Sequence, residues 1–251
     1  MQELQTLNLD TLGSAAGDSV PSTLVNIAEQ ASQSGSFESM APPLQIALFL
    51  GAMVMLSGAL VSITAFTRIV IVLSFVRKAL STQEIPPTQV IIGLSLFLTL
   101  FVMAPTFHAM HEKAISKYMN QQMSAGETFE VCKEEMLDFM RSHLRSNSGI
   151  SALNLFLEVS KTGEIDQYED APVHVVIPAF IIHELKLAFI MGFCIYIPFL
   201  LIDLVVSTVL MSLGMMMMPP VVISTPCKLM LFVLVDGWTL IIKTITASFG
   251  A

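Results

Sequence analysis

Eight ionisable side chains lie inside long apolar stretches of this sequence. They are Arg68, His183, Glu184, Lys186, Asp203, Lys228, Asp236 and Lys243. A charge surrounded by hydrocarbon is costly, so such residues usually pair with an opposite charge or line a path for ions or protons. Their expected chemistry is therefore ion pairing or proton transfer, and each is a candidate functional residue.

Glu184 and Lys228 have opposite charges and lie in different apolar segments. A salt bridge between two helices, or between neighbouring copies of the chain, would satisfy both side chains. Alternatively, Lys186, Lys228 and Lys243 each extend their alkyl stem so that the ammonium group reaches a membrane interface. The residues alone leave both interpretations open.

Catalytic patterns built on histidine are incomplete here. His183 and Glu184 begin a zinc-protease pattern, but Leu187 stands where the second histidine of one helix face is needed. His108 and His111 could share a helix face, yet no carboxylate or cysteine stands at a convincing spacing from them. We interpret them as a surface pair and predict no metal site.

Other enzymatic functions also lack their residues. Asp203 and Asp236 would form an aspartic-protease dyad only if their carboxylates met and shared a proton, which the residues around Asp236 do not indicate. No glycine-rich phosphate loop is present, so the chain is not expected to hydrolyse nucleotide. We therefore predict no catalytic residue, no cofactor and a non-enzymatic role.

A run of four methionines stands between Gly214 and a double proline. The four residues are Met215, Met216, Met217 and Met218. Proline removes a backbone donor and clashes with a continuing helix, so the run belongs to a loop or a helix end. Methionine is flexible and fills irregular gaps. The run either fills a core between helices or forms a deformable ring that closes an aperture.

The composition is that of an integral membrane protein. Hydrophobic residues make up 54%, charged residues 13%, and the mean hydropathy is +0.73, whereas soluble domains carry about 25% charged residues. The formal net charge is −8, and no basic patch exists to neutralise phosphates, so nucleic acid is not an expected partner. Cys194 and Cys227 lie in apolar stretches and are interpreted as small core residues.

Four apolar segments, residues 44–76, 90–110, 173–213 and 226–247, predict membrane helices. Helices satisfy their own backbone groups in lipid, so the predicted fold class is all-α, with membrane-associated helical hairpins. Residues 173–213 are too long for one straight crossing at about 1.5 Å per residue, and the segment contains Pro178 and Pro198, where kinks are expected.

The chain divides into four regions on this pattern. Residues 1–43 form an acidic, flexible N-terminal tail without a recognisable signal peptide, and residues 44–110 form the first apolar hairpin. Residues 111–172 form a polar helical insert, with amphipathic helices expected near 134–144 and 150–159. Residues 173–251 form the second apolar hairpin. Arg77 and Lys78 place the link inside the first hairpin in the cytoplasm, so the insert is expected on the opposite, periplasmic side.

Several stretches of the two apolar hairpins together resemble the FliP family. In the first hairpin they read FTRIVIVLSF at 66–75, PPTQVIIGL at 86–94 and VMAP at 102–105. In the second they read IPAFIIHELK at 177–186, IPFLLIDLVV at 197–206, residues 213–223 with the methionine run, and PCKLMLFVLVDGW at 226–238. The resemblance covers roughly residues 44–110 and 173–250, and the motifs favour the flagellar branch of the family over the related injectisome (SctR) branch.

This resemblance implies a subunit of the bacterial type III protein export gate. Five copies would form a ring with FliQ-like and FliR-like partners in the inner membrane at the flagellar basal body, and unfolded protein substrates would pass through its centre. It implies that Met215 to Met218 act as a gasket and that Glu184 and Lys228 form an intersubunit salt bridge. It also implies that the hairpins stack largely above the bilayer plane.

We therefore expect a pore-forming core subunit of the flagellar export gate. The remaining charges in its apolar segments, Arg68, Lys186, Asp203 and Asp236, are secondary site candidates. The alternative is a secondary transporter in which Glu184, Asp203 and Asp236 relay protons. Transporters of that kind usually contain internal repeats, and the sequence has no convincing one.

Overall fold

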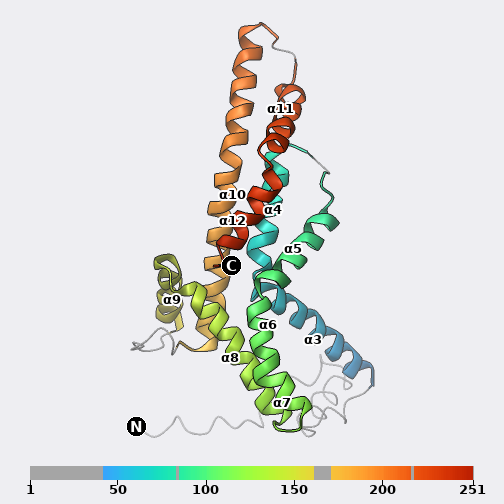
Figure 1. Cartoon of the computed structure of the whole chain (residues 1–251), viewed down its shortest axis with the longest axis vertical. Helices are drawn as coiled ribbons and strands as arrows, with labels where there is room; N and C mark the ends of the chain where they lie inside the picture. The colour runs from blue at the N-terminus through green and yellow to red at the C-terminus, as the bar shows by residue number, and fades with distance from the viewer. Residues whose placement is uncertain (1–41, 83–84, 161–170, 216–217, 251) are drawn as a thin grey trace, which may run out of the picture. The chain divides into compact units, whose positions relative to one another are not determined.

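The computed structural model describes residues 42–82, 85–160, 171–215 and 218–250 (Figure 1). Within these ranges the secondary structure is helical and contains no strand, which confirms the all-α prediction. The expected N-terminal tail lies almost wholly outside the described residues. The helices are α3 (Pro42–Ser62), α4 (Phe66–Ala79), α5 (Thr88–Val102), α6 (Ala104–Met110), the π-helix η2 (His111–Ile115), α7 (Ser116–Met119), α8 (Ala125–Leu144), α9 (Asn147–Ser160), α10 (Val173–Ser212), α11 (Pro220–Leu234) and α12 (Gly237–Ala247).

The chain forms two compact units, residues 1–57 and residues 58–251. The boundary falls within α3, and the helices from α4 onward belong to the second unit. The first apolar segment, predicted over residues 44–76, is divided into α3 and α4 by a break between Ser62 and Phe66. Thr64 Oγ1 accepts a bond from the Phe66 amide at 3.3 Å, and Thr67 Oγ1 donates to the Val61 carbonyl at 3.2 Å. These local bonds satisfy backbone groups that the break releases.

The core of the second unit lies between α4 and α10, which run alongside each other (Figure 1). α4 buries Ile69, Val72 and Val76 completely, one apolar face at the spacing of a helix. Gly192 of α10 lets the two helices approach closely, because a Cβ atom there would lie 2.5 Å from the ring of Phe75. The α4–α10 pair therefore forms the frame on which α5, α8, α9 and α11 pack.

α10 is a single helix of 40 residues with Pro178 and Pro198 in its interior. It ends in a Schellman motif, in which the Gly214 amide bonds the Met211 carbonyl and the Met215 amide bonds the Leu210 carbonyl, each at 3.1 Å. Gly214 has φ of +75°, a conformation that glycine adopts without a steric penalty. The chain then turns back into α11, whose face toward α10 contains Ser224, Lys228 and Phe232.

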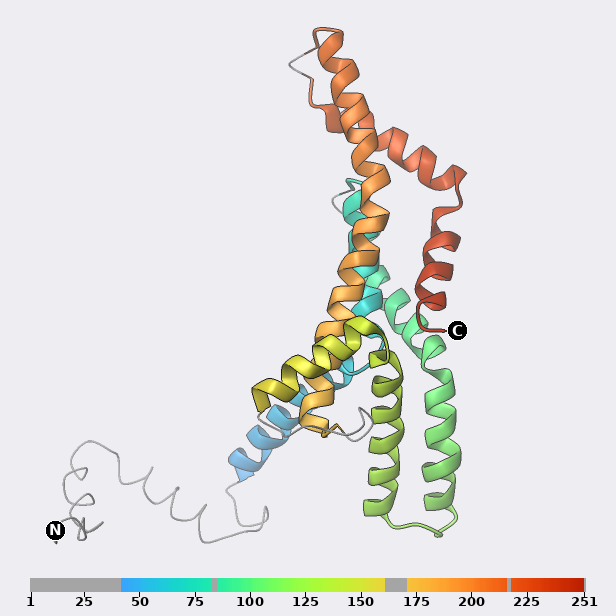
Figure 2. The same cartoon turned by 90° about the vertical axis from the view of Figure 1, so that its left-hand side faces the viewer.

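The region expected to form two amphipathic helices contains α8 and α9. α8 begins with a capping box, in which Ser124 Oγ accepts a bond from the Glu127 amide and the Glu127 carboxylate accepts one from the Ser124 amide. Figure 2 shows α8 beside the α6–α7 segment, and an ion pair between Lys113 and Glu135 at 2.5 Å links them. Phe139 of α8 packs against Phe180 of α10, with 6.0 Å between ring centroids.

α10 is long and apolar enough to cross a membrane. Two bent helix pairs, Thr88–Val102 with Ala104–Met119 and Pro220–Leu234 with Gly237–Ala247, would raise the number of spans to three if each pair counts as one. This assignment rests on length and composition and applies to the described residues only. It agrees with the membrane character of the sequence.

Candidate functional site

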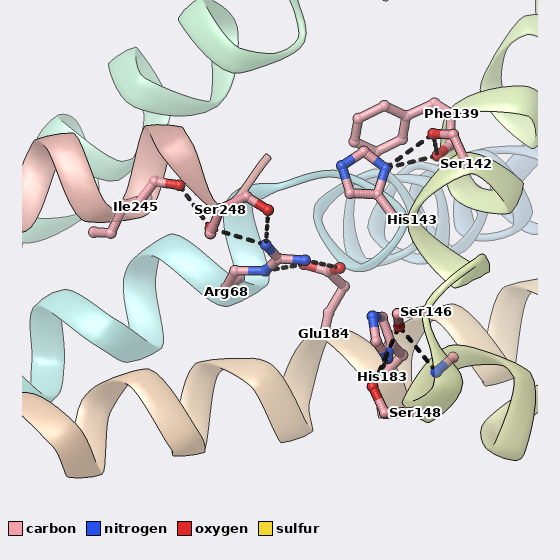
Figure 3. Close-up of polar contacts among 11 residues, drawn as sticks. Arg68, Phe139, Ser142, His143, Ser146, Ser148, His183, Glu184, Ile245 and Ser248 are labelled. Carbon is pink, nitrogen blue, oxygen red and sulfur yellow. Dashed lines mark hydrogen bonds and ion pairs between the residues drawn. The ribbon is translucent and has the colours of Figure 1, made fainter. Parts of the chain in front are cut away.

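The most buried charges among the described residues form an ion pair between α4 and α10 (Figure 3). Arg68 Nε donates to Glu184 Oε2 at 2.7 Å, and Arg68 Nη2 donates to Glu184 Oε1. The side chains are 1% and 0% exposed. A guanidinium and a carboxylate that meet through two parallel bonds have a fixed relative orientation as well as a favourable energy. The pair therefore sets the register of α4 on α10.

The C-terminal turn closes the remaining side of Arg68. Arg68 Nη1 donates to the carbonyl oxygen of Ser248 at 3.1 Å and to its hydroxyl oxygen at 3.0 Å. The Phe249 ring lies over the guanidinium, with 3.8 Å from Arg68 Cζ to the ring centroid. Neutral oxygen acceptors and an aromatic face each stabilise a cation. The turn therefore stabilises the buried positive charge of Arg68.

Two histidines join this pair to α8 and α9. His183 precedes Glu184 on α10, and its Nδ1 lies 3.3 Å from the Ser148 hydroxyl of α9. His143 of α8 lies with Nδ1 2.8 Å from the Phe139 carbonyl and its ring 5.4 Å from that of Phe249. Burial of His143 lowers the pKa of its imidazole below 6.5, although the Phe139 carbonyl acts in the opposite direction. His143 is thus held in a mainly apolar contact with the C-terminal turn.

A second ion pair lies between α10 and α11. Lys228 Nζ donates to Asp203 Oδ2 at 2.5 Å and to the Ser81 hydroxyl at 2.6 Å. Lys228 is 2% exposed, whereas Asp203 is 37% exposed. Ser81 follows α4 and has φ of +56°, which brings its hydroxyl to the ammonium group. This cluster ties the end of α4 to the α10–α11 hairpin.

Within one chain, Glu184 and Lys228 do not bind each other. Arg68 occupies both oxygens of Glu184, and Asp203 and Ser81 bind Lys228. The sequence identified all four charged residues as candidates but did not assign them as these pairs. A salt bridge between Glu184 and Lys228 of neighbouring copies stays a prediction, because the structure contains a single chain.

The other candidate charges belong to neither ion pair. Lys186 is exposed on α10, and Lys243 is exposed on α12. Asp236 is also exposed and has φ of +49°, at the break between α11 and α12. The apolar segment predicted over residues 226–247 is therefore divided between α11 and α12, and the Asp-Gly dipeptide at 236–237 is the turn signal that marks the break.

The predictions for the two cysteines and for the histidine pair have different outcomes. Cys194 and Cys227 are exposed in the chain, so their interpretation as core residues was wrong: they lie on the outward faces of α10 and α11. His108 is exposed, with Nδ1 3.6 Å from a Glu112 carboxylate oxygen. No group of three or more metal-binding side chains occurs among the described residues.

The methionine run lies where α10 turns into α11. Met215 and Met218 are 39% and 40% exposed at this tip, while Met216 and Met217 lie outside the described residues. The Met218 amide bonds the Met215 carbonyl at 3.3 Å, and Pro219 then precedes α11. The two described thioethers are thus partly exposed between the end of α10 and the start of α11.

Comparisons with known proteins agree on one family. The FliP family model matches residues 49–245, a range that contains both ion pairs and the methionine tip. The flagellar biosynthetic protein FliP of Bacillus subtilis (strain 168) is 48% identical over 212 residues, 84% of this chain and 94% of its own length. FliP of Pectobacterium carotovorum is 46% identical over 82% of this chain and 78% of its own. FliP of Borreliella burgdorferi is 43% identical over 82% and 81%, respectively. With a family model that covers most of the sequence and relatives this similar, the chain belongs to the FliP family.

Proposed function

We propose that this chain is a non-enzymatic, pore-forming core subunit of the flagellar type III protein export gate. The observation that carries the proposal is the FliP match over residues 49–245, supported by relatives that are named flagellar biosynthetic proteins. In this proposal the chain resides in the bacterial inner membrane at the flagellar basal body, with residues 111–172 on the periplasmic side. Unfolded flagellar substrates pass through a ring of five copies, together with FliQ-like and FliR-like subunits.

The exposed apolar faces of the chain support assembly into such a ring. α10 and α11 expose many large apolar side chains, including Phe193 at 61%, Val233 at 74% and Leu234 at 77%. α10 is about 60 Å long at 1.5 Å per residue, roughly twice the hydrocarbon thickness of a bilayer. Lipid alone therefore does not cover this surface along its whole length, and contacts with other subunits would cover the rest.

The proposed gate is the methionine tip. Met215 and Met218 are exposed at a turn that Gly214 and Pro219 define, and Met216 and Met217 belong to the same run. Thioether side chains repack at low cost around objects of different shape. A ring of such tips would exclude water and ions when empty and deform around a passing chain.

The tip is tested by alanine substitution of Met215 to Met218 in the complete chain, expressed in cells that assemble the flagellum. We expect increased ion leakage across the membrane and reduced motility. Met230→Ala is the matched control, because Met230 is an exposed methionine (66%) on α11 away from the tip. Unchanged leakage and motility in the tip variant would reject the gasket.

We also propose the salt bridge between Glu184 and Lys228 of neighbouring copies. Because each of these residues already has a partner within one chain, assembly must reorganise both ion pairs. Glu184→Lys and Lys228→Glu should each impair assembly, and the double swap should partly restore it. Additive defects would argue against direct pairing. The double variant Arg68→Glu, Glu184→Arg keeps the ion pair within the chain but removes the carboxylate that would bind Lys228 of a neighbouring copy. It therefore separates the intrachain contact from the proposed contact between copies.

The geometry does not favour a proton relay through Glu184, Asp203 and Asp236. Glu184 and Asp203 are nineteen residues apart on one helix, about 28 Å at 1.5 Å per residue. Each is bound by its own cation. Asp236 is exposed at a helix break. A relay needs neighbouring groups, so the transporter alternative lacks support.

A further inference from the structure

The last turn of the chain has a fixed conformation at Arg68. The Ser248 amide bonds the Thr244 and Ile245 carbonyls, and the Gly250 amide bonds the Ala247 carbonyl, each at 3.1 Å. The Ser248 hydroxyl donates to the Ile245 carbonyl at 2.6 Å, which leaves its lone pairs to accept from Arg68 Nη1. The carbonyl and the hydroxyl of Ser248 thus both point at the guanidinium (Figure 3).

The ring of Phe249 contacts both the ion pair and α8. It lies 3.8 Å from Arg68 Cζ and 5.4 Å, centroid to centroid, from the ring of His143. Arg68 comes from α4, His143 from α8 and Phe249 from the end of α12. One aromatic ring therefore joins three segments that are far apart in the sequence.

We propose that Ser248 and Phe249 form a C-terminal latch, which positions Arg68 for its two bonds to Glu184 and couples α8 and α12 to the α4–α10 frame. Glu184 binds Nε and Nη2, so Nη1 and the face of the guanidinium are left to other groups. The latch supplies both: two oxygen acceptors for Nη1 and a π surface for the face. Without it, the buried cation would lose these contacts while Glu184 stayed in place. This role does not depend on the proposed gate function.

A cation–π contact predicts that the aromatic character of position 249 matters, beyond its apolar volume. Phe249→Tyr keeps the ring, whereas Phe249→Leu keeps an apolar side chain and removes the π surface. In the complete chain, purified from membranes in detergent with its oligomeric state recorded, Phe249→Leu should lower the thermal midpoint by about 2–6 °C and Phe249→Tyr by much less. Trp238→Leu, an aromatic substitution on α12, is the matched control.

Arg68→Lys provides the decisive comparison, because lysine keeps the charge but loses the planar fork that stacks on the ring. In the Arg68→Lys background, the effect of Phe249→Leu should fall to less than half of its value in the natural sequence, whereas the effect of Trp238→Leu should not change. Equal effects of Phe249→Leu in both backgrounds would show that Phe249 contributes only ordinary apolar packing, and would overturn the latch.

Two further measurements keep the proposal testable if Arg68→Lys does not accumulate. Ser248→Ala removes one acceptor of Nη1, and removal of residues 248–251 removes the whole latch. Both should increase amide hydrogen exchange in α4 around Arg68, whereas removal of Ala251 alone should leave it unchanged. Unaltered exchange after removal of residues 248–251, or equal midpoints for Phe249→Leu and Phe249→Tyr, would contradict the latch.

Discussion

Asp203 and Lys228 meet across the α10–α11 hairpin one helical turn nearer its tip than the contact between Phe199 and Phe232. Asp203 and Lys228 are four residues from Phe199 and Phe232, respectively, and those two rings lie 6.3 Å apart. Two contacts with equal spacing on both helices define the antiparallel register. The next pair toward the tip in this register is Ser207 with Ser224.

The register predicts that cysteines introduced at Ser207 and Ser224 will crosslink within one chain. Ser224 is fully buried, and its hydroxyl has no hydrogen-bond partner among the described residues, so it faces a packed surface. With the native cysteines replaced by serine, a short thiol crosslinker should join the two introduced thiols of the Ser207→Cys, Ser224→Cys variant efficiently, as measured by mass spectrometry of the peptides. Ser207→Cys with Thr225→Cys is the off-register control, and stronger crosslinking there would contradict the assignment.

Loss of Asp203 and loss of Lys228, the two partners of the second ion pair, should lower the stability of the chain by different amounts. Asp203→Asn leaves the ammonium of Lys228 buried without its counter-ion, whereas Lys228→Met removes the buried charge and leaves an Asp203 that water partly reaches. We expect Asp203→Asn to destabilise the chain by about 1–3 kcal/mol, less than the loss of a partner in a fully buried pair. Lys228→Met should cost less, and adding it to Asp203→Asn should restore part of the stability. Thermal unfolding measures the stability of the two single variants and the double variant. A double variant less stable than Asp203→Asn would refute the claim that the unpaired ammonium of Lys228 destabilises the chain.

Gly192→Ala tests the close approach of α4 and α10. A Cβ atom at Gly192 would lie 2.5 Å from the Phe75 ring, so the helices must separate or the ring must leave its position. Overpacking of this kind typically costs about 1–3 kcal/mol. The thermal midpoint should fall, and Phe75→Leu should restore part of it. Gly93→Ala is the control, since nothing lies within 4 Å of a Cβ there; it should be neutral or slightly stabilising.

His143 should make the stability of the fold depend on pH below its ordinary pKa. Burial lowers the pKa of His143 in the folded chain relative to 6.5, so the unfolded chain takes up the proton first as the pH falls. Stability is then complete above about pH 6.5 and decreases as the pH falls from there toward the lower folded pKa. His143→Gln should flatten the pH dependence of thermal unfolding between about pH 7 and pH 5, and the exposed His108→Gln should not. Identical profiles for the two variants would contradict the effect.

Much of this site could be recognised from residue type alone. Arg68, Glu184, Asp203 and Lys228 stand out because a charge in an apolar segment requires compensation. The pairing could not be read from the sequence, because it depends on which face of α10 meets α4 and which meets α11. An apolar helix such as α10, with large side chains on all sides, has no periodic pattern that selects its contact faces.

The C-terminal latch could not be predicted. Ser248 and Phe249 follow the last apolar segment with no motif around them, and their role arises only because α12 ends beside Arg68. Ser81 was missed for a similar reason: its hydroxyl reaches Lys228 through a left-handed backbone conformation, which a serine after a helix does not reveal. By contrast, Gly214 and the double proline did predict the turn at the methionine tip.

The two ion pairs also restrict how α10 can move. At about 100° per residue, the nineteen-residue separation of Glu184 and Asp203 points these carboxylates in directions about 100° apart around the helix axis. One carboxylate is held by α4 and the other by α11. Rotation of α10 about its own axis would therefore pull both acids away from their cations at once. The rotation of α10 about its axis is thus fixed at two positions along the helix. The direction in which the methionine tip points around that axis is set by charges that lie about 18 Å and about 46 Å from it along the helix, at about 1.5 Å for each residue.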